Sequence, residues 1–244
     1  MSQLRSAKFC AGLVVGMTVG WFALPASAVV TTFENGAEGW SLNGREMIFP
    51  TGGNPGARLN LFTQSFGAHT VNTTNSEFLG DFTRFGSPIR ISIDLNAILV
   101  RSVPLGRPLM HSMTVQLVDT NDSDDPRTWV SVWYKLGTIG ERVPGWQELS
   151  VTVDPTETTL PVGWGGTGDE DPVTHMPRLP LDRTFDSVMT SVDQIRFTTM
   201  VPGYVYPTSF FHLQVDNIAL SAVPEPGSLG LLAVGGLLTL RRWH

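Results

Sequence analysis

The sequence predicts an all-β protein, an antiparallel β-sandwich that lies between two terminal segments of a different character. Apolar residues alternate with polar ones over several short stretches, as in strands with one buried face. Clusters of Gly, Pro, Asn and Asp separate these stretches, and the middle of the sequence has no long amphipathic helical pattern. Such strands bury their apolar faces against a second sheet, so a sandwich is the simplest architecture.

Residues 1–28 have the layout of a secretory signal peptide. A short basic region precedes an apolar core over residues 9–23, and Ala26 and Ala28 supply the small residues that signal peptidase requires. We expect signal peptidase to cleave after Ala28, and a retained N-terminal anchor is the alternative. Cys10 is the only cysteine of the chain, so cleavage would leave an exported protein without thiol or disulfide chemistry.

Residues 29–222 form the expected exported domain. The alternation predicts strands over residues 91–95, 113–118, 130–135, 149–153, 195–199 and 211–220, and a short helix is compatible with residues 185–192. This segment has 12 basic and 21 acidic residues, so it should be repelled by phosphate backbones and is not expected to bind nucleic acid. The acidic stretch 119–126 lacks the glycine and the glutamate of an EF-hand loop and is predicted to connect two strands of a hairpin.

Residues 223–244 form a tail with a short apolar stretch. The 14 uncharged residues 227–240 would span about 21 Å as a helix, less than the ~30 Å hydrocarbon core of a bilayer. Arg241 and Arg242 should keep the extreme C-terminus on the cytoplasmic side of the membrane. Pro224 and Pro226 favour an extended segment just before this stretch, a shape that suits the active site of a protease or transpeptidase.

The order of these tail features resembles the PEP-CTERM sorting signal of Gram-negative bacteria that produce exopolysaccharide. The matching residues are Val223, Pro224, Glu225 and Pro226, followed by the apolar stretch and by Arg241 and Arg242. The resemblance implies recognition by an exosortase, which removes the tail and passes the protein to the cell surface or extracellular matrix. Membrane attachment would then be transient, and an ordinary tail anchor is the alternative.

Short patterns along the exported domain resemble jelly-roll domains of the galactose-binding-like, carbohydrate-binding-module and laminin-IV type. They are TTFENGAEGW, NPGARL, FLGDF, GWQELSVTV and FHLQVDNIALS. The resemblance implies that the first and last strands pair. In related carbohydrate-binding modules two acidic residues at such positions help to hold a structural Ca²⁺, which here implicates Glu34 and Asp216.

The residues around Asp216 are compatible with this implied calcium site. The alternation of apolar residues changes phase at Asp216 and Asn217, which predicts a β-bulge there. Two carboxylates are too few for Ca²⁺, which takes six to eight oxygen ligands, so backbone carbonyls or water would have to complete the site. The alternative is a solvated turn at Glu34 and a hydrogen-bonded bulge at Asp216.

Tryptophan side chains provide candidate stacking surfaces for a sugar. Trp129 and Trp133 are expected on one face of their strand and Val130 and Val132 on the other, so one of these sets should be outside the core. If the tryptophans lie outside, they form a platform for a glycan; packing against the core is the alternative. Trp40 and Trp146 are expected in the core.

Catalytic motifs are not found in the sequence. The histidines are scattered, without zinc-protease spacing, and no Gly-x-Ser-x-Gly nucleophile elbow occurs. We therefore expect an exported, non-catalytic protein of the extracellular matrix, with extracellular polysaccharide as its partner. A structural matrix protein without a ligand and a polysaccharide-active hydrolase are the alternatives.

Overall fold

The computed structural model describes residues 28–42, 45–86, 88–121 and 123–223. The predicted signal peptide up to residue 27 and the sorting residues from Pro224 onward, Arg241 and Arg242 included, lie outside the described residues. The strands are β1 (Ala28–Thr31), β2 (Trp40–Leu42), β3 (Arg45–Phe49), β4 (Arg58–Ser65), β5 (His69–Asn72), β6 (Ile89–Ser102), β7 (His111–Asp119), β8 (Val130–Ile139), β9 (Gln147–Val153), β10 (Trp164–Thr167), β11 (Asp169–Glu170), β12 (Pro177–Arg178), β13 (Gln194–Thr198) and β14 (Ser209–Ala222). The helical elements are the 3₁₀ turns η1 (Ser76–Phe78), η2 (Phe82–Phe85) and η3 (Pro126–Thr128) and the helix α1 (Phe185–Met189).

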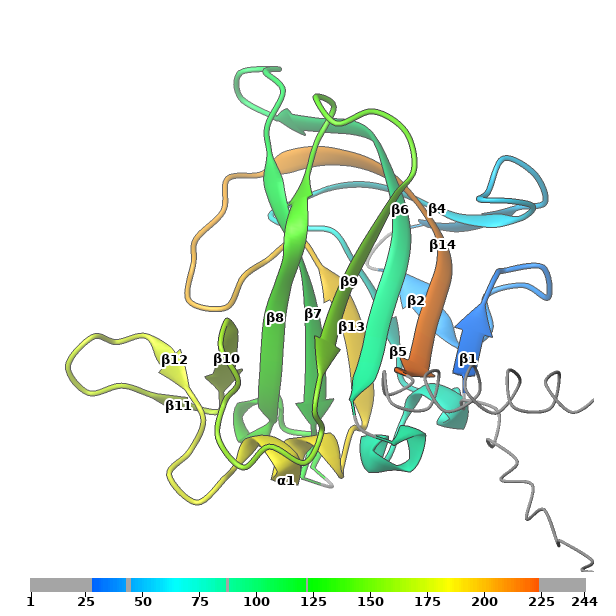
Figure 1. The fold of residues 1–244 in the computed structure, drawn as a ribbon. Coiled ribbons are helices and arrows are strands. Elements are labelled where there is room, and N and C mark those ends of the chain that lie inside the picture. Colours follow the sequence, from blue (N-terminus) through cyan, green and yellow to red (C-terminus); the bar gives the residue numbers. More distant parts are fainter. Residues whose placement is uncertain (1–27, 43–44, 87, 122, 224–244) are drawn as a thin grey trace, which may run out of the picture.

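Two six-stranded antiparallel sheets pack face to face. Sheet A has the order β3-β4-β14-β6-β9, with β1 also paired to β14, and sheet B has the order β10-β8-β7-β13-β5-β2. In Figure 1, β6, β9 and β14 of sheet A lie in front of β7, β13 and β5 of sheet B, and the β11–β12 hairpin projects to one side. The predicted all-β sandwich is confirmed, and each predicted strand overlaps an observed one.

Alternation explains which side chains fill the space between the sheets. Ile91, Ile93 and Leu95 of β6 are fully buried, as are Val115 and Leu117 of β7. The hairpin predicted around the acidic stretch is present, because β7 and β8 pair and residues 120–129 connect them. The predicted short helix is also present, although it ends at Met189, before the expected residue 192.

One of the two tryptophans expected in the core is there, and the other is not. Trp40 is almost fully buried and packs its ring edge-on against Phe78, with 5.4 Å between the ring centroids. The prediction for Trp146 was wrong, because this residue is only half-buried. It lies in the turn before β9, where the alternation of strand side chains does not yet apply. Trp164 of β10 is buried instead and packs on Phe185, at 5.1 Å between ring centroids.

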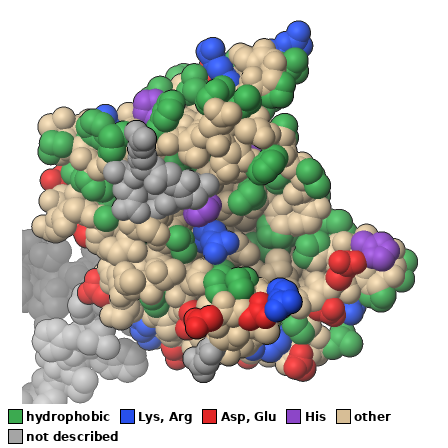
Figure 2. Space-filling model, turned by 180° about the vertical axis from the view of Figure 1, so that it is seen from behind, with side chains coloured by type: hydrophobic (Ala, Val, Ile, Leu, Met, Phe, Trp, Pro, Cys, Tyr) green, Lys and Arg blue, Asp and Glu red, His purple; other side chains and the backbone are tan. Residues whose placement is uncertain are grey.

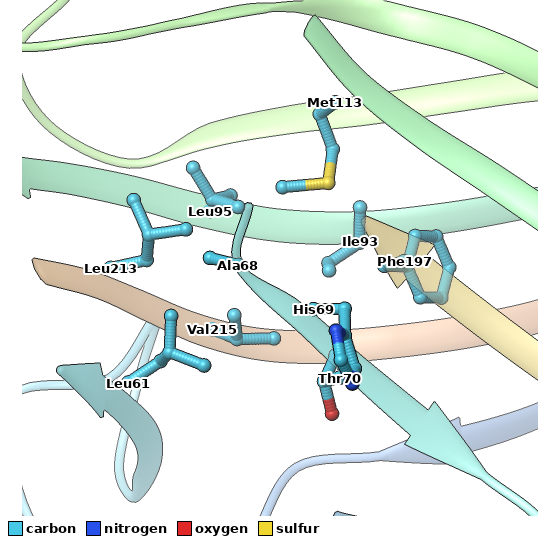
Figure 3. Close-up of a pocket in the computed structure, with 10 residues that line it drawn as sticks. All are labelled: Leu61, Ala68, His69, Thr70, Ile93, Leu95, Met113, Phe197, Leu213 and Val215. Atoms are coloured by element: carbon cyan, nitrogen blue, oxygen red, sulfur yellow. The ribbon is translucent and has the colours of Figure 1, made fainter. Parts of the chain in front are cut away.

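A small apolar cavity lies between the sheets. Figure 3 shows the residues that line it: Leu61, Ile93, Leu95, Leu213 and Val215 from sheet A, with Ala68, His69, Thr70, Met113 and Phe197 on the sheet B side. Its volume of about 10 Å³ is the size of a single water molecule at most. A sugar ring does not fit in this cavity.

The ends of the described chain lie side by side. β1 pairs with the end of β14, with Ala28 opposite Ser221 and Thr31 opposite Ile218, as the jelly-roll resemblance implies. The β-bulge predicted in β14 is confirmed by a register shift after Asp216, and Asn217 has a φ of 45°. Within the described residues, no helix is long and apolar enough to cross a bilayer.

Candidate functional site

The outer face of sheet B is organised as two rows of side chains, which we call the sheet B face. Strand register places Gly165, Trp133, Gln116, Arg196, Val71 and Ser41 in one row across six strands. The neighbouring row contains Lys135, Thr114, Thr198 and His69. Since Val115 and Phe197, which lie between the two rows on β7 and β13, point into the core, the two rows lie on the opposite side of the sheet. This is the side of the molecule that Figure 2 shows.

Trp133 lies on the sheet B face, half-buried against β10. Its indole ring occupies the space over Gly165, because a Cβ at residue 165 would come within 2.3 Å of the ring atom Cζ2. The indole Nε1 is buried and has no hydrogen-bond partner among the described residues. Trp133 is therefore an aromatic surface seated on a glycine, with one donor that remains unused.

Trp129 is not brought together with Trp133. It lies directly after η3, four residues before Trp133, and strand geometry separates the two Cα atoms by roughly 13 Å. Its indole Nε1 donates to the carbonyl oxygen of Ser123 at 2.7 Å. This hydrogen bond stabilises the loop between β7 and β8, and Trp129 does not extend the aromatic surface of Trp133.

Polar side chains surround Trp133 on this face. Gln116 Nε2 donates to Ser131 Oγ at 2.8 Å, and Ser131 Oγ lies 2.7 Å from Thr167 Oγ1. Arg196 is half-buried and donates from Nη2 to Gln194 Oε1 at 3.2 Å. Arg196 and Gln116 were not singled out from the sequence, since alternation shows which side chains share a face of one strand but not which strands are neighbours.

His69 lies on the same face but carries no charge at neutral pH. Burial lowers the pKa of His69 to about 4, and the nearby Arg196 guanidinium lowers it further in the same direction. His69 itself is half-buried, and its register partner Thr198 is buried. The permanent positive charges of the sheet B face are therefore those of Arg196 and Lys135.

The loop of residues 199–208 contacts the β11–β12 hairpin. This loop runs from β13 toward the side on which β12 lies (Figure 1). A Cβ at Gly203 would come within 2.7 Å of Pro177 Cδ, so this loop touches the β11–β12 hairpin. Tyr204, in the loop, is 63% exposed.

The two predicted calcium ligands meet at another place, the loop of residues 50–57. Glu34 Oε1 accepts a hydrogen bond from the Ala57 backbone N–H at 2.7 Å, and Asp216 Oδ2 accepts one from the Asn54 N–H at 2.5 Å. Asp94, which the sequence did not single out, lies directly opposite Asp216 and accepts from Asn54 Nδ2 at 3.0 Å. Three carboxylates from β6, β14 and the turn after β1 therefore surround one loop.

The surroundings of Asp216 disfavour the ionised form of its carboxyl group. Burial raises the pKa of Asp216, and the charges of Asp94 and Glu34 raise it further, against the hydrogen bonds from the Asn54 and Asn217 backbones. Among the described residues, no group of three or more His, Cys, Asp or Glu side chains is spaced to hold a metal ion. Oxygens do converge beside Gly53, where a Cβ would lie 1.9 Å from the Ala57 carbonyl oxygen and 2.6 Å from Asp216 Oδ2. This donor set of carboxylate and carbonyl oxygens has the chemistry that Ca²⁺ prefers.

No family model matches the chain, and no curated protein matches it. Solved structures do resemble it. The tandem CBM22-1–CBM22-2 domain of Paenibacillus barcinonensis Xyn10C is 11% identical over 83% of this chain and 51% of that chain, with a TM-score of 0.47. The CBM22-1–GH10 modules of Clostridium thermocellum Xyn10B, complexed with xylohexaose, are 13% identical over 79% of this chain and 28% of that chain, with a TM-score of 0.44.

The structural neighbours include carbohydrate-binding modules. The CBM22-1 xylan-binding domain of P. barcinonensis Xyn10C is 10% identical over 81% of this chain and 94% of that chain, with a TM-score of 0.41. This chain spans about half or less of the two larger structures and nearly the whole of this single module.

Proposed function

We propose that the protein is an exported, non-catalytic glycan binder of the extracellular matrix and that the sheet B face holds the glycan. The observation that carries this proposal is the seating of Trp133 over Gly165, in a row with Gln116 and Arg196. An aromatic ring offers an apolar surface to the C–H groups of a sugar, while the amide and guanidinium groups beside it hydrogen-bond to hydroxyl oxygens. This combination of one apolar surface and a few polar groups is typical of small-molecule and sugar sites.

Substitution of Trp133 tests the site. We expect Trp133→Ala to weaken binding of a retained polysaccharide about tenfold or more in affinity gels, which corresponds to about 1.4 kcal/mol. Phe62→Ala is the matched control, because Phe62 is an exposed aromatic residue on β4 of the other sheet, and Trp129→Ala tests the second tryptophan proposed from the sequence. Weakening by Phe62→Ala with no effect of Trp133→Ala would place the glycan elsewhere.

The same assay separates the other candidate functions. A structural matrix protein without a ligand would bind none of the polysaccharides tested. A hydrolase would release new reducing ends from a polysaccharide that it binds, and such turnover would refute the non-catalytic proposal.

Calcium is proposed as a structural ion at the loop of residues 50–57. Glu34 and Asp216 would hold it together with the Ala57 carbonyl oxygen, and Asp94 would add negative charge nearby. The ion would supply positive charge that offsets the repulsion among the carboxylates. It would have no direct role on the sheet B face, which belongs to the other sheet.

Export and sorting complete the proposal. Signal peptidase would cleave after Ala28, and an exosortase would recognise the Val223–Pro226 segment, remove the tail after transient membrane attachment and deliver the domain to the cell surface or matrix of a Gram-negative bacterium. Mass spectrometry of the surface-released protein should find an N-terminus at Val29 and a C-terminus well before Arg241 and Arg242. Released protein that still ends at His244 would refute the processing step.

A further inference from the structure

The charge of the sheet B face differs from the charge of the molecule as a whole. Acidic residues outnumber basic ones by 21 to 12 between residues 29 and 222. Nevertheless the two rows that define the face contain Arg196 and Lys135 and no acidic residue. In Figure 2, basic and histidine side chains lie near the middle of this side of the molecule, and acidic side chains gather toward its lower edge.

Arg196 lacks the partner that a half-buried guanidinium normally has. Among the described residues, its buried Nε has no hydrogen-bond acceptor, and its one side-chain hydrogen bond is to the neutral amide of Gln194. None of the ion pairs among the described residues includes Arg196 or Lys135. A partly desolvated cation without a counter-charge is unfavourable on its own, so the site is suited to an incoming anion.

In the row of Trp133, Gln116 and Arg196, two buried side-chain nitrogens have no hydrogen-bond partner among the described residues. Trp133 Nε1 can only donate, and Arg196 Nε can only donate. Gln116 lies between these two residues in the register, so their Cα atoms are roughly 10 Å apart across two strand spacings. Lys135 is exposed two residues after Trp133 on β8 and points to the same side. Trp133 Nε1 and Arg196 Nε are both buried, so a ligand would reach the accessible parts of the Arg196 and Lys135 side chains, and their charges favour a ligand that carries negative charge.

We propose that the sheet B face selects anionic polysaccharides, whose carboxylate or sulfate groups bind Arg196 and Lys135 while a sugar ring lies on Trp133. This inference rests on the proposed glycan-binding function and adds the class of ligand. The planar guanidinium of Arg196 offers a fork of N–H groups that matches an oxyanion, and the Lys135 ammonium adds a point charge. Because the rest of the domain is acidic, long-range attraction does not explain such binding, and the preference must come from these residues.

Matched pairs of polymers test the preference. Polygalacturonate and its carboxyl-reduced form differ in the carboxylate alone, and dextran sulfate and dextran differ in the sulfate alone. We expect calorimetry at ~0.1 M salt to show at least tenfold tighter binding to the charged member of one pair, and the pair that shows it identifies the oxyanion. Equal binding within both pairs would overturn the anionic preference and leave glycan binding standing, whereas no binding to any of the four polymers or to the other polysaccharides tested would remove both.

Substitutions of Arg196 and Lys135 test whether these residues cause the preference for anionic polysaccharides. Arg196→Gln should reduce it about tenfold, Arg196→Lys should retain part of it, and Lys135→Gln should reduce it about threefold. Arg107→Gln is the matched control, since Arg107 is an exposed arginine between β6 and β7 that contributes the same charge elsewhere. An equal effect of Arg107→Gln would overturn the proposal, because the preference would then reflect net charge. Lys135 is exposed, so Lys135→Gln keeps the test valid if the Arg196 variants do not fold.

Discussion

Trp133 keeps its position because residue 165 carries no side chain. The φ of Gly165 is not in the left-handed region, so an alanine there would meet the indole ring without straining the backbone. The cost of Gly165→Ala should therefore fall on the ring, which must move away from β10 by roughly 1–2 Å to restore an ordinary contact with the new methyl group. Substitution of Gly165 therefore changes the position of the Trp133 ring without removing the ring.

We expect Gly165→Ala to weaken glycan binding by roughly half as much, in free energy, as Trp133→Ala, while the unfolding midpoint changes little. Affinity gels and thermal unfolding measure the two effects on the same samples. Gly145→Ala is not a suitable control for Gly165→Ala, because Gly145 has a φ of 84° and an alanine there would strain the backbone. Gly137→Ala is the better control, because Gly137 lies on the same strand as Trp133 and its Cβ would meet only a Leu149 methyl group, at 3.0 Å. Normal glycan binding by Gly165→Ala would contradict a role for the ring.

At the scale of strands, periodicity predicts the sandwich class and the six strands β6, β7, β8, β9, β13 and β14, but it does not predict β2–β5 or β10–β12. The burial of Ile91, Ile93 and Leu95 on one side of β6 follows from alternation, and the change of phase at Asp216 predicts the bulge of β14. Strand partners do not follow from alternation, because pairing is a property of the whole sheet. Arg196 and Asp94 were missed for that reason: each acquires its role only through a neighbour on another strand.

At the bulge of β14, the buried carboxyl group of Asp216 lies opposite Asp94. The stability of the folded protein should therefore depend on pH through Asp216. Since the pKa of Asp216 is raised in the folded state, its contribution to stability is present at low pH and is lost as the pH rises through the folded-state pKa. In EDTA, Asp216→Asn should therefore gain stability relative to the unsubstituted protein between pH 4 and pH 7. Denaturant unfolding at the two pH values measures the difference.

Asp169 provides a control, because its pKa is shifted in the opposite direction from that of Asp216. The backbone N–H of Glu170 and the side chain of Arg178 lower the pKa of Asp169, so its contribution is present near neutral pH and is lost on acidification. Asp169→Asn should thus lose stability relative to the unsubstituted protein as the pH rises from 4 to 7, and only slightly, because the pair is exposed. Parallel trends for the two variants would refute the conclusion that the folded protein disfavours the charged form of Asp216.

At the scale of the whole molecule, the loop of residues 50–57 connects parts of the chain that are far apart in sequence. Glu34 follows β1, Asp94 belongs to β6 and Asp216 belongs to β14, so an ion bound there would cross-link both ends of the domain to its middle. Such an ion would bind the folded state and not the unfolded chain, and it would stabilise the entire domain by mass action.

Removal of calcium should accordingly lower the melting temperature of the whole protein in a single transition. At a free Ca²⁺ concentration one hundred times the dissociation constant, the stabilisation is about 2.7 kcal/mol, which corresponds to roughly 5–10 °C for a domain of this size. Scanning calorimetry in Ca²⁺ and in EDTA measures this shift, and Asp216→Ala should abolish it. Asp124→Ala should keep it, because Asp124 is an exposed residue of the acidic connection between β7 and β8, where no ion is expected. A melting curve that EDTA leaves unchanged would show that the carboxylates hold the loop by hydrogen bonds alone, and the pH behaviour of Asp216 would then persist at every calcium concentration.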